Sequence, residues 1–211
     1  MQQKLILFDL DGTLIDSLEG IAEALNETRK YAGLEKLDLE TVRLAVGNGA
    51  AILIDRTIPA AALAHDKALE LFKHNLTLVP AQRTLLYPGV KSGLEELKKS
   101  GFTLGVVSNK PSAACKKLLD TYEISPFLTE IIGGDSPYPL KPEPDALLAV
   151  KEKISPKLCI MCGDHYTDLE AGRRANFTTI LAKYGFGDPQ NEVPDFCAEN
   201  FAEVVEICKK F

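Results

Sequence analysis

Two aspartates, Asp9 and Asp11, stand two residues apart directly after a short apolar run, Leu5-Ile6-Leu7-Phe8. A carboxylate in this place can act as a nucleophile, a metal ligand or a general acid or base. Gly12 follows the pair, and Asp with Gly is also the composition of an ordinary turn at the end of a strand. Taken alone, the pair leaves both interpretations open.

A serine and an asparagine, Ser108 and Asn109, follow a second apolar run, with Lys110 and Pro111 after them. A hydroxyl, an amide and a helix N-terminus together bind an anion without a net positive charge. Ordinary capping of the next helix by Ser108 or Asn109 is the alternative.

One lysine, Lys141, is followed by prolines at positions 142 and 144, which restrict the backbone around it. A lysine held in a fixed direction is one interpretation, and a freely exposed lysine is the alternative.

A second acidic pair, Asp164 and Asp168, follows another apolar run. The alternative for Asp168 is that it only caps the next helix. His165, between the two acids, faces a substrate or is a plain loop histidine; the sequence does not decide between these.

Alternating strands and helices are the elements that must position these side chains. We expect strands over residues 4–8, 102–107, 130–132, 158–161 and 178–181, and helices over 90–99, 111–122, 144–153 and 168–175. This order predicts an α/β fold, a Rossmann-like, doubly wound parallel sheet covered on both faces. Ligands of such sheets bind at the carboxyl ends of the strands. We therefore expect the two acidic pairs, the Ser108–Asn109 pair and Lys141 to meet at one edge of the sheet. Carboxylates grouped there favour Mg²⁺.

The stretch from about residue 17 to residue 83 interrupts the alternation with helical periodicity. An Asp16–Glu19 capping pair should open a helix that runs to about Tyr31, and further helices fit residues 39–46, 50–57 and 60–76. We therefore predict a core made of residues 1–15 and 84–211, with an inserted helical cap domain at 16–83. The cap should hinge near Asp16 and near Arg83.

Composition excludes several classes of function. The chain of 211 residues carries a formal net charge of -6 and no basic cluster, which argues against a nucleic-acid partner. No apolar run approaches the roughly 20 residues of a membrane span, so no membrane partner is expected. The five scattered cysteines fit a reducing, cytoplasmic location. Cys159 and Cys162 lie three apart on an expected strand, so they should face opposite sides as buried thiols rather than bind zinc.

Four motifs in order resemble those of the haloacid dehalogenase superfamily, in its phosphatase branch: D-x-D-G-T at residues 9–13, Ser108–Asn109, Lys141, and G-D-x-x-x-D at residues 163–168. The helical insertion resembles that of its helical-cap members. Among these the chain most resembles the phosphoglycolate phosphatases, on the stretches Val46-Gly47-Asn48-Gly49-Ala50, Tyr87-Pro88-Gly89-Val90, Ser108-Asn109-Lys110-Pro111 and Gly133-Gly134-Asp135-Ser136.

The resemblance implies a magnesium-dependent phosphatase for a small phosphorylated metabolite, with 2-phosphoglycolate as the favoured substrate. Asp9 would attack phosphorus and form an aspartyl-phosphate, and Asp11 would act as acid and then base. The implied roles are catalytic for Asp9, Asp11 and Lys141; metal-binding for Asp9, Asp11 (through its backbone oxygen), Asp164 and Asp168; and substrate-binding for Thr13, Ser108, Asn109, Lys141, Arg43, Asn48 and Gly49.

Two of these expectations lie in the cap. The Gly47-Asn48-Gly49 loop should reach the substrate because glycines permit a close backbone approach, although a simple helix-to-helix turn is the alternative. Arg43 is the candidate for contacting a substrate carboxylate.

Three other functions compete with this interpretation. A phosphosugar mutase would keep all four motifs, although the cap resembles that branch less. A non-catalytic binding protein would have lost Asp9 or Asp11, and a true dehalogenase would lack Asp11. The chain departs from the family pattern at His165 and at Asn176, which replaces a glycine at a helix end; asparagine tolerates the left-handed conformation there. A monomer or homodimer is expected.

Overall fold

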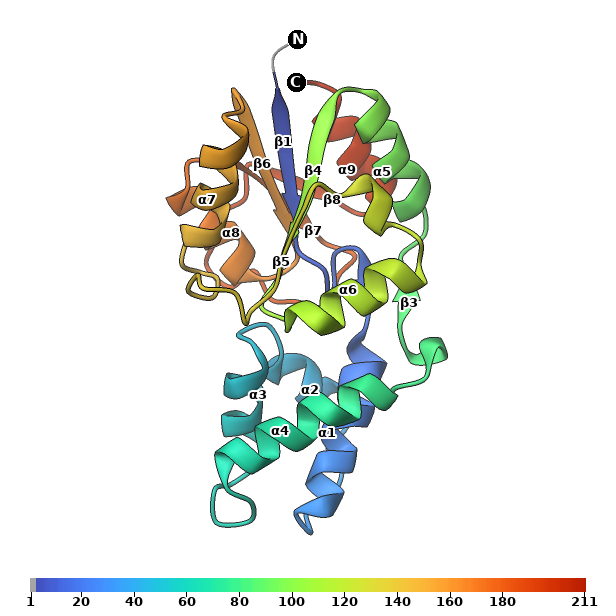
Figure 1. Cartoon of the computed structure of the whole chain (residues 1–211), viewed down its shortest axis with the longest axis vertical. Coiled ribbons are helices and arrows are strands. Elements are labelled where there is room, and N and C mark those ends of the chain that lie inside the picture. Colours follow the sequence, from blue (N-terminus) through green and yellow to red (C-terminus); the bar gives the residue numbers. More distant parts are fainter. Residues whose placement is uncertain (1–2) are drawn as a thin grey trace.

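The computed structural model describes residues 3–211, so the first two residues of the expected core segment 1–15 lie outside the described residues. The chain forms two parts stacked end to end: a sheet flanked by helices, and a group of helices, α1 to α4, at one end of that sheet (Figure 1). Within the described part of the chain, no helix is long and apolar enough to cross a membrane.

The sheet has six parallel strands. In spatial order they are β5 (Glu130–Ile132), β4 (Phe102–Val107), β1 (Lys4–Phe8), β6 (Leu158–Gly163), β7 (Thr178–Ala182) and β8 (Phe196–Ala198). Strand β1 lies inside the sheet and pairs with β4 on one side and β6 on the other. The predicted Rossmann-like α/β fold is therefore confirmed. Strand β8 was not predicted because it is three residues long and two of them are exposed.

Helices cover both faces of this sheet. Ile6 and Phe8 of β1 pack in a cluster with α5 (Val90–Lys99), α6 (Ser112–Thr121) and α9 (Phe201–Cys208). Leu5 and Leu7 point the other way, toward α7 (Asp145–Ile154) and α8 (Tyr166–Arg174). Alternate residues of a strand face opposite sides, so a strand buried on both faces is a continuous apolar run. Cys159 and Cys162 divide between the two clusters in the same way, as predicted, and both are free thiols.

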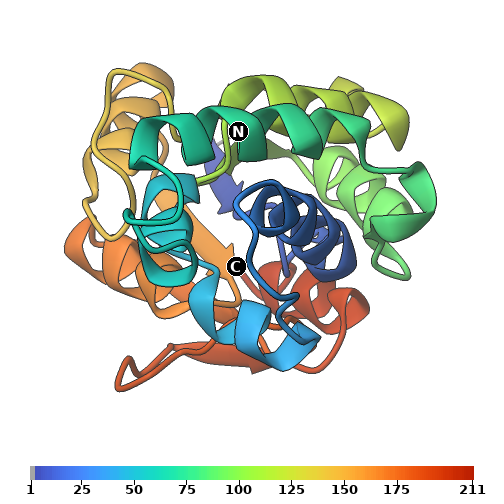
Figure 2. The same cartoon turned by 90° about the horizontal axis from the view of Figure 1, so that it is seen from below.

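The four helices at the end of the sheet, here called the cap, are α1 (Leu18–Tyr31), α2 (Leu39–Ala45), α3 (Ala50–Thr57) and α4 (His65–Leu78). They bury a cluster of their own that contains Leu25, Ile54 and Phe72. The chain enters the cap through β2 (Ile15–Asp16) and returns through β3 (Leu85–Leu86), which pair antiparallel. Seen from below, the cap helices lie across the end of the sheet (Figure 2). The domain limits at 16–83 stay a prediction.

Several helix boundaries differ from the prediction. Helix α4 begins at His65 instead of residue 60, because the backbone turns at Pro59, whose carbonyl accepts from Ala62 and Leu63. The Asp16–Glu19 capping pair does not form: the N-cap of α1 is Ser17, and Glu19 pairs with Arg83 at 2.9 Å. Helix α8 begins at Tyr166, two residues before the predicted start. Short 3₁₀ turns at Ala81–Arg83 and Ser125–Phe127 were not predicted.

Asn176 adopts the left-handed conformation (φ 56°) that its place at the end of α8 predicted. Its side chain is exposed, so a substitution there tests backbone strain without removing buried contacts. We expect Asn176→Val to lower the free energy of unfolding by about 1–2 kcal/mol, because a β-branched residue is strained there. Urea unfolding measures the difference, with Asn176→Gly as the control that keeps near wild-type stability. Equal stability of the Val and Gly variants would contradict the strain argument.

Candidate active site

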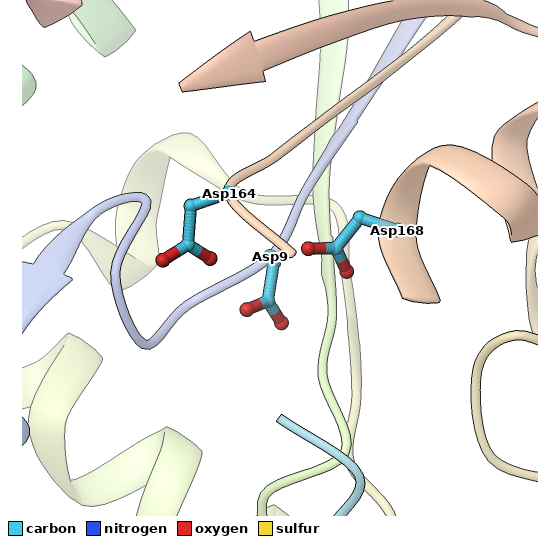
Figure 3. Close-up of side chains that lie close together, drawn as sticks. All are labelled: Asp9, Asp164 and Asp168. Atoms are coloured by element: carbon cyan, nitrogen blue, oxygen red, sulfur yellow. The ribbon is translucent and has the colours of Figure 1, made fainter. Parts of the chain in front are cut away.

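Three carboxylates converge where β1 and β6 end. Asp9 follows β1, Asp164 follows β6, and Asp168 comes from the first turn of α8; all three are at most 8% exposed. Their side chains lie close together (Figure 3), and one oxygen from each falls within 4.8 Å of the other two. Parallel strands deliver these groups to one edge of the sheet, as the sequence predicted.

Lys141 lies among these carboxylates with a side chain that is 2% exposed. Its ammonium donates to Asp9 Oδ1 at 2.7 Å, to Asp168 Oδ1 at 2.7 Å and to the Val107 carbonyl at 2.5 Å. These three acceptors use all three donors of the ammonium group. The lysine is thus held in one direction rather than left free.

Burial and mutual repulsion shift the protonation of the acids. Burial, with a further contribution from Asp168, raises the pKa of Asp9 to about 6, although Lys141 opposes the shift. Burial and the charges of Asp168 and Asp9 raise the pKa of Asp164 well above its usual value. Burial alone would lower the pKa of Lys141, but the carboxylates of Asp168 and Asp9 raise it instead. The site thus contains one positively charged side chain, Lys141, and three acidic ones. This imbalance of charge favours the binding of a further cation.

The donor set fits Mg²⁺. Asp9, Asp164 and Asp168 offer only carboxylate oxygens, the hard ligands that magnesium prefers. Asp164 is oriented by the Gly187 backbone N–H, which donates to its Oδ2 at 2.7 Å. Asp168 is oriented by the His165 backbone N–H, which donates to its Oδ2 at 3.0 Å. Fixed second partners of this kind hold metal-binding carboxylates in place.

Asp168 has a second structural task that the sequence left open. It is the third residue of α8, and His165 is the N-cap: the His165 side chain accepts from the Thr167 N–H while Asp168 accepts from His165. Asp168 therefore completes a capping box instead of serving as the N-cap itself. His165 lines the cavity described below, and burial lowers its pKa to about 4, which keeps the ring neutral near pH 7.

Asp11 lies at the mouth of this group and has two partners. The Ser17 hydroxyl donates to Asp11 Oδ1 at 2.5 Å, and the Lys110 ammonium lies 3.1 Å from both carboxylate oxygens. Neither Lys110 nor Ser17 was predicted to have a role in the site. The signal for Lys110 was its place directly after the Ser108–Asn109 pair at the end of β4.

Ser108 and Asn109 differ in what they contact. Ser108 is buried at the cavity wall. The Asn109 side chain instead accepts from the Lys141 N–H at 2.9 Å and donates to the carbonyls of Lys141 at 3.0 Å and Gly47 at 3.1 Å. The amide predicted to hold phosphoryl oxygens thus fixes the backbone of Lys141 and joins it to the cap.

The Gly47-Asn48-Gly49 loop of the cap reaches the core. A side-chain carbon on Gly47 would lie 2.4 Å from His165 Nε2, so the loop approaches this closely only with glycine there (φ 116°). Asn48 Nδ2 donates to the Tyr166 hydroxyl at 2.5 Å, so this predicted substrate contact turns toward α8. Gly47 and Gly49 line the cavity.

The loop after β7 also joins cap and core. Phe186 packs against the cap cluster, and its carbonyl accepts from Arg43 Nη1 at 3.2 Å. The rest of the Arg43 guanidinium is forked on Glu40, at 2.6 and 2.7 Å. Gly187, one residue further, holds Asp164. This loop follows the carboxyl end of β7, so the expectation that ligands bind at the carboxyl ends of the strands could have identified it.

A cavity of about 70 Å³ lies between cap and core. Its wall combines the core groups with apolar cap side chains such as Ile21, Leu53 and Phe72. Of the predicted substrate-binding residues, Arg43, Gly49, Ser108, Asn109 and Lys141 line it. Thr13 does not: it is fully buried, and its hydroxyl has no hydrogen-bond partner among the described residues.

Known proteins resemble this chain along its whole length. The family model for haloacid dehalogenase-like hydrolases matches residues 6–182. A phosphoglycolate phosphatase of Aquifex aeolicus is 36% identical over 97% of this chain and 96% of its own, and one of Vibrio parahaemolyticus is 36% identical over 97% and 95%. The solved structure of a predicted phosphoglycolate phosphatase from Haemophilus somnus superposes with a TM-score of 0.87, at 30% identity over 99% of both chains.

The raised pKa of Asp9 makes magnesium binding depend on pH. Below about pH 6 this carboxyl holds a proton that the metal must displace. In the metal-free protein, the raised pKa of Asp9 lowers the free energy of unfolding, because the ionised carboxylate is less favourable in the folded than in the unfolded state. This destabilisation is largest above about pH 6 and decreases as the pH falls toward 3.8. We therefore expect Mg²⁺ to raise the melting temperature clearly at about pH 7.5 and much less at about pH 5. Differential scanning fluorimetry measures this, and Asp9→Asn should respond weakly at both. An equal shift at the two pH values for the wild type would contradict it.

Proposed function

The chain belongs to the haloacid dehalogenase-like hydrolases, and from this membership we propose that it is a magnesium-dependent phosphatase of 2-phosphoglycolate. The observation that carries the proposal is the Asp9 carboxylate at the end of β1, which faces the cavity, is fixed by Lys141 and lies beside two further acids. This arrangement suits a nucleophile that attacks phosphorus.

In the proposed reaction an Asp9 oxygen forms a bond to phosphorus as the ester oxygen leaves with its electron pair. Asp11 gives its proton to that oxygen, so an alcohol departs and an aspartyl-phosphate remains. Asp11 then takes a proton from water, which attacks the phosphorus and releases phosphate and Asp9. The Ser17 hydroxyl at 2.5 Å holds Asp11 in the direction that both proton transfers require.

Charge is the main obstacle to this attack. A carboxylate about 4 Å from a phosphate dianion meets roughly 8 kcal/mol of repulsion at an effective dielectric near 20. Lys141 contributes one fixed positive charge against it. Mg²⁺, when bound by Asp9, Asp164 and Asp168 with the Asp11 backbone oxygen, supplies the further positive charge. Ser108 is the candidate to contact the phosphoryl oxygens from the cavity wall.

The size of the cavity supports a small substrate. About 70 Å³ is well below the roughly 300–1,000 Å³ of pockets for drug-sized ligands. The relatives named phosphoglycolate phosphatase, at about a third identity over nearly the whole chain, favour 2-phosphoglycolate in particular. A phosphosugar mutase must hold and turn a larger molecule, which the small cavity does not favour. A cytoplasmic location and a monomer or homodimer stay predictions.

Asp9 and Asp11 should fail differently when each is replaced by asparagine. We expect Asp9→Asn to form no phosphoenzyme and to turn over negligibly, since an amide is a poor nucleophile. Asp11→Asn should still take phosphate from an ester with a good leaving group and then release it slowly, since only proton transfer is lost. Quenched-flow trapping of the phosphoenzyme distinguishes them. Asp9→Asn with more than a few per cent of wild-type turnover would refute Asp9 as the nucleophile.

The substrate assignment is tested by kcat/KM for 2-phosphoglycolate against ethyl phosphate, sugar phosphates, nucleotides and pyrophosphate. Reading of the carboxylate should favour 2-phosphoglycolate over ethyl phosphate by on the order of 2–5 kcal/mol in transition-state free energy. Equal values for the two esters would remove the assignment and leave a phosphatase of another substrate. Assays with and without a chelator check the need for Mg²⁺ in the same series.

A further inference from the structure

We propose that Lys110 binds the carboxylate of the substrate. It thereby selects phosphate esters in which a carboxylate is attached directly to the carbon that bears the ester oxygen. The inference rests on the proposed function and adds to it a specificity residue outside the four motifs. The Lys110 side chain is 7% exposed and lines the cavity together with Asp9, Asp11 and Lys141.

The position of Lys110 follows from its contact with Asp11. Asp11 must lie next to the ester oxygen if it protonates the leaving group. The Lys110 ammonium is 3.1 Å from both oxygens of that carboxylate, so it lies beside the same ester oxygen. In 2-phosphoglycolate a single methylene separates the ester oxygen from the carboxylate carbon. The carboxylate therefore stays close to the ester oxygen, and Lys110 is the cavity-lining cation in contact with Asp11 beside it.

The other two cations of the cavity are committed elsewhere. Lys141 uses its three donors on Asp9, Asp168 and the Val107 carbonyl. Arg43 is forked on Glu40 and bonded to the Phe186 carbonyl. Within residues 3–211 the Lys110 ammonium contacts only the Asp11 carboxylate, through two long contacts. Since an ammonium has three donors, Lys110 retains the capacity for a further acceptor.

Asp11 does not depend on Lys110 for its orientation. The Ser17 hydroxyl holds Asp11 Oδ1 at the shorter distance of 2.5 Å. Lys110 can therefore engage the substrate while Asp11 stays in place, and removal of Lys110 leaves the acid–base group with a partner. A Lys110 variant can therefore distinguish recognition of the substrate carboxylate from acid–base catalysis by Asp11.

Three esters that differ only at one position test the proposal: 2-phosphoglycolate, ethyl phosphate and O-phosphoethanolamine, which present a carboxylate, a methyl group and an aminomethyl cation. We expect Lys110→Met to lower the kcat/KM ratio of 2-phosphoglycolate to ethyl phosphate by about 30-fold or more. The same variant should improve O-phosphoethanolamine relative to ethyl phosphate, because a like charge has been removed. Lys110→Arg should keep most of the wild-type preference.

Two controls accompany these variants. Lys116→Met makes the same replacement at an exposed lysine paired with Asp120, and it should leave all three ratios unchanged. Arg43→Met tests the other candidate for the carboxylate, and thermal unfolding confirms that each variant is folded.

The outcomes separate this proposal from the proposed function. A wild-type enzyme without preference for 2-phosphoglycolate overturns the substrate assignment and, with it, the role of Lys110. A wild-type preference that survives Lys110→Met, or that disappears only in Arg43→Met, overturns Lys110 alone. An equal loss for all three esters in Lys110→Met also overturns it, because Lys110 would then act only through Asp11.

Discussion

The repulsion among Asp9, Asp164 and Asp168 is the constraint on which the rest of the site depends. Three acids with oxygens within 4.8 Å of one another are buried at one sheet edge, where unpaired charge is expensive. Lys141 reduces this repulsion by pairing with Asp9 and Asp168. Asn109 in turn fixes the backbone of Lys141 through hydrogen bonds to both its N–H and its C=O. The residual negative charge would favour a divalent cation at this edge.

The same crowding reaches into the backbone around the acids. A side-chain carbon on Gly163 would lie 2.3 Å from Asp168, so the end of β6 has no room for another residue beside that carboxylate. Asn109 fixes the backbone of Lys141, and the loop at Gly187 orients the Asp164 carboxylate; both also contact the cap. The electrostatics of the core and the position of the cap are therefore parts of one arrangement.

The sequence was sufficient to predict the position of Asp9, Ser108 and Asp164, each of which directly follows a strand of the sheet. Asp9, Ser108 and Asp164 come together because the carboxyl ends of parallel strands share an edge, and runs such as Leu5–Phe8 are unambiguous for a strand buried on both faces. Side-chain directions in the cap could not be read this way: Asn48 turns to Tyr166, and Arg43 is held by Glu40. The helix expected over residues 60–76 begins only at His65, because the backbone turns at Pro59. Lys110 was missed because the sequence does not fix the direction of its side chain, which turns to Asp11.

The Phe186 ring belongs to the core by sequence but packs with the cap cluster, half-buried against it. Swinging the cap away returns part of this ring to water, which opposes the motion by a fraction of the roughly 1.5–3 kcal/mol that full burial of such a side chain contributes. The Phe186 contact would therefore favour this arrangement of cap and core in the absence of a ligand. If substrate enters only when cap and core separate, the rate of that separation would limit the rate of substrate entry.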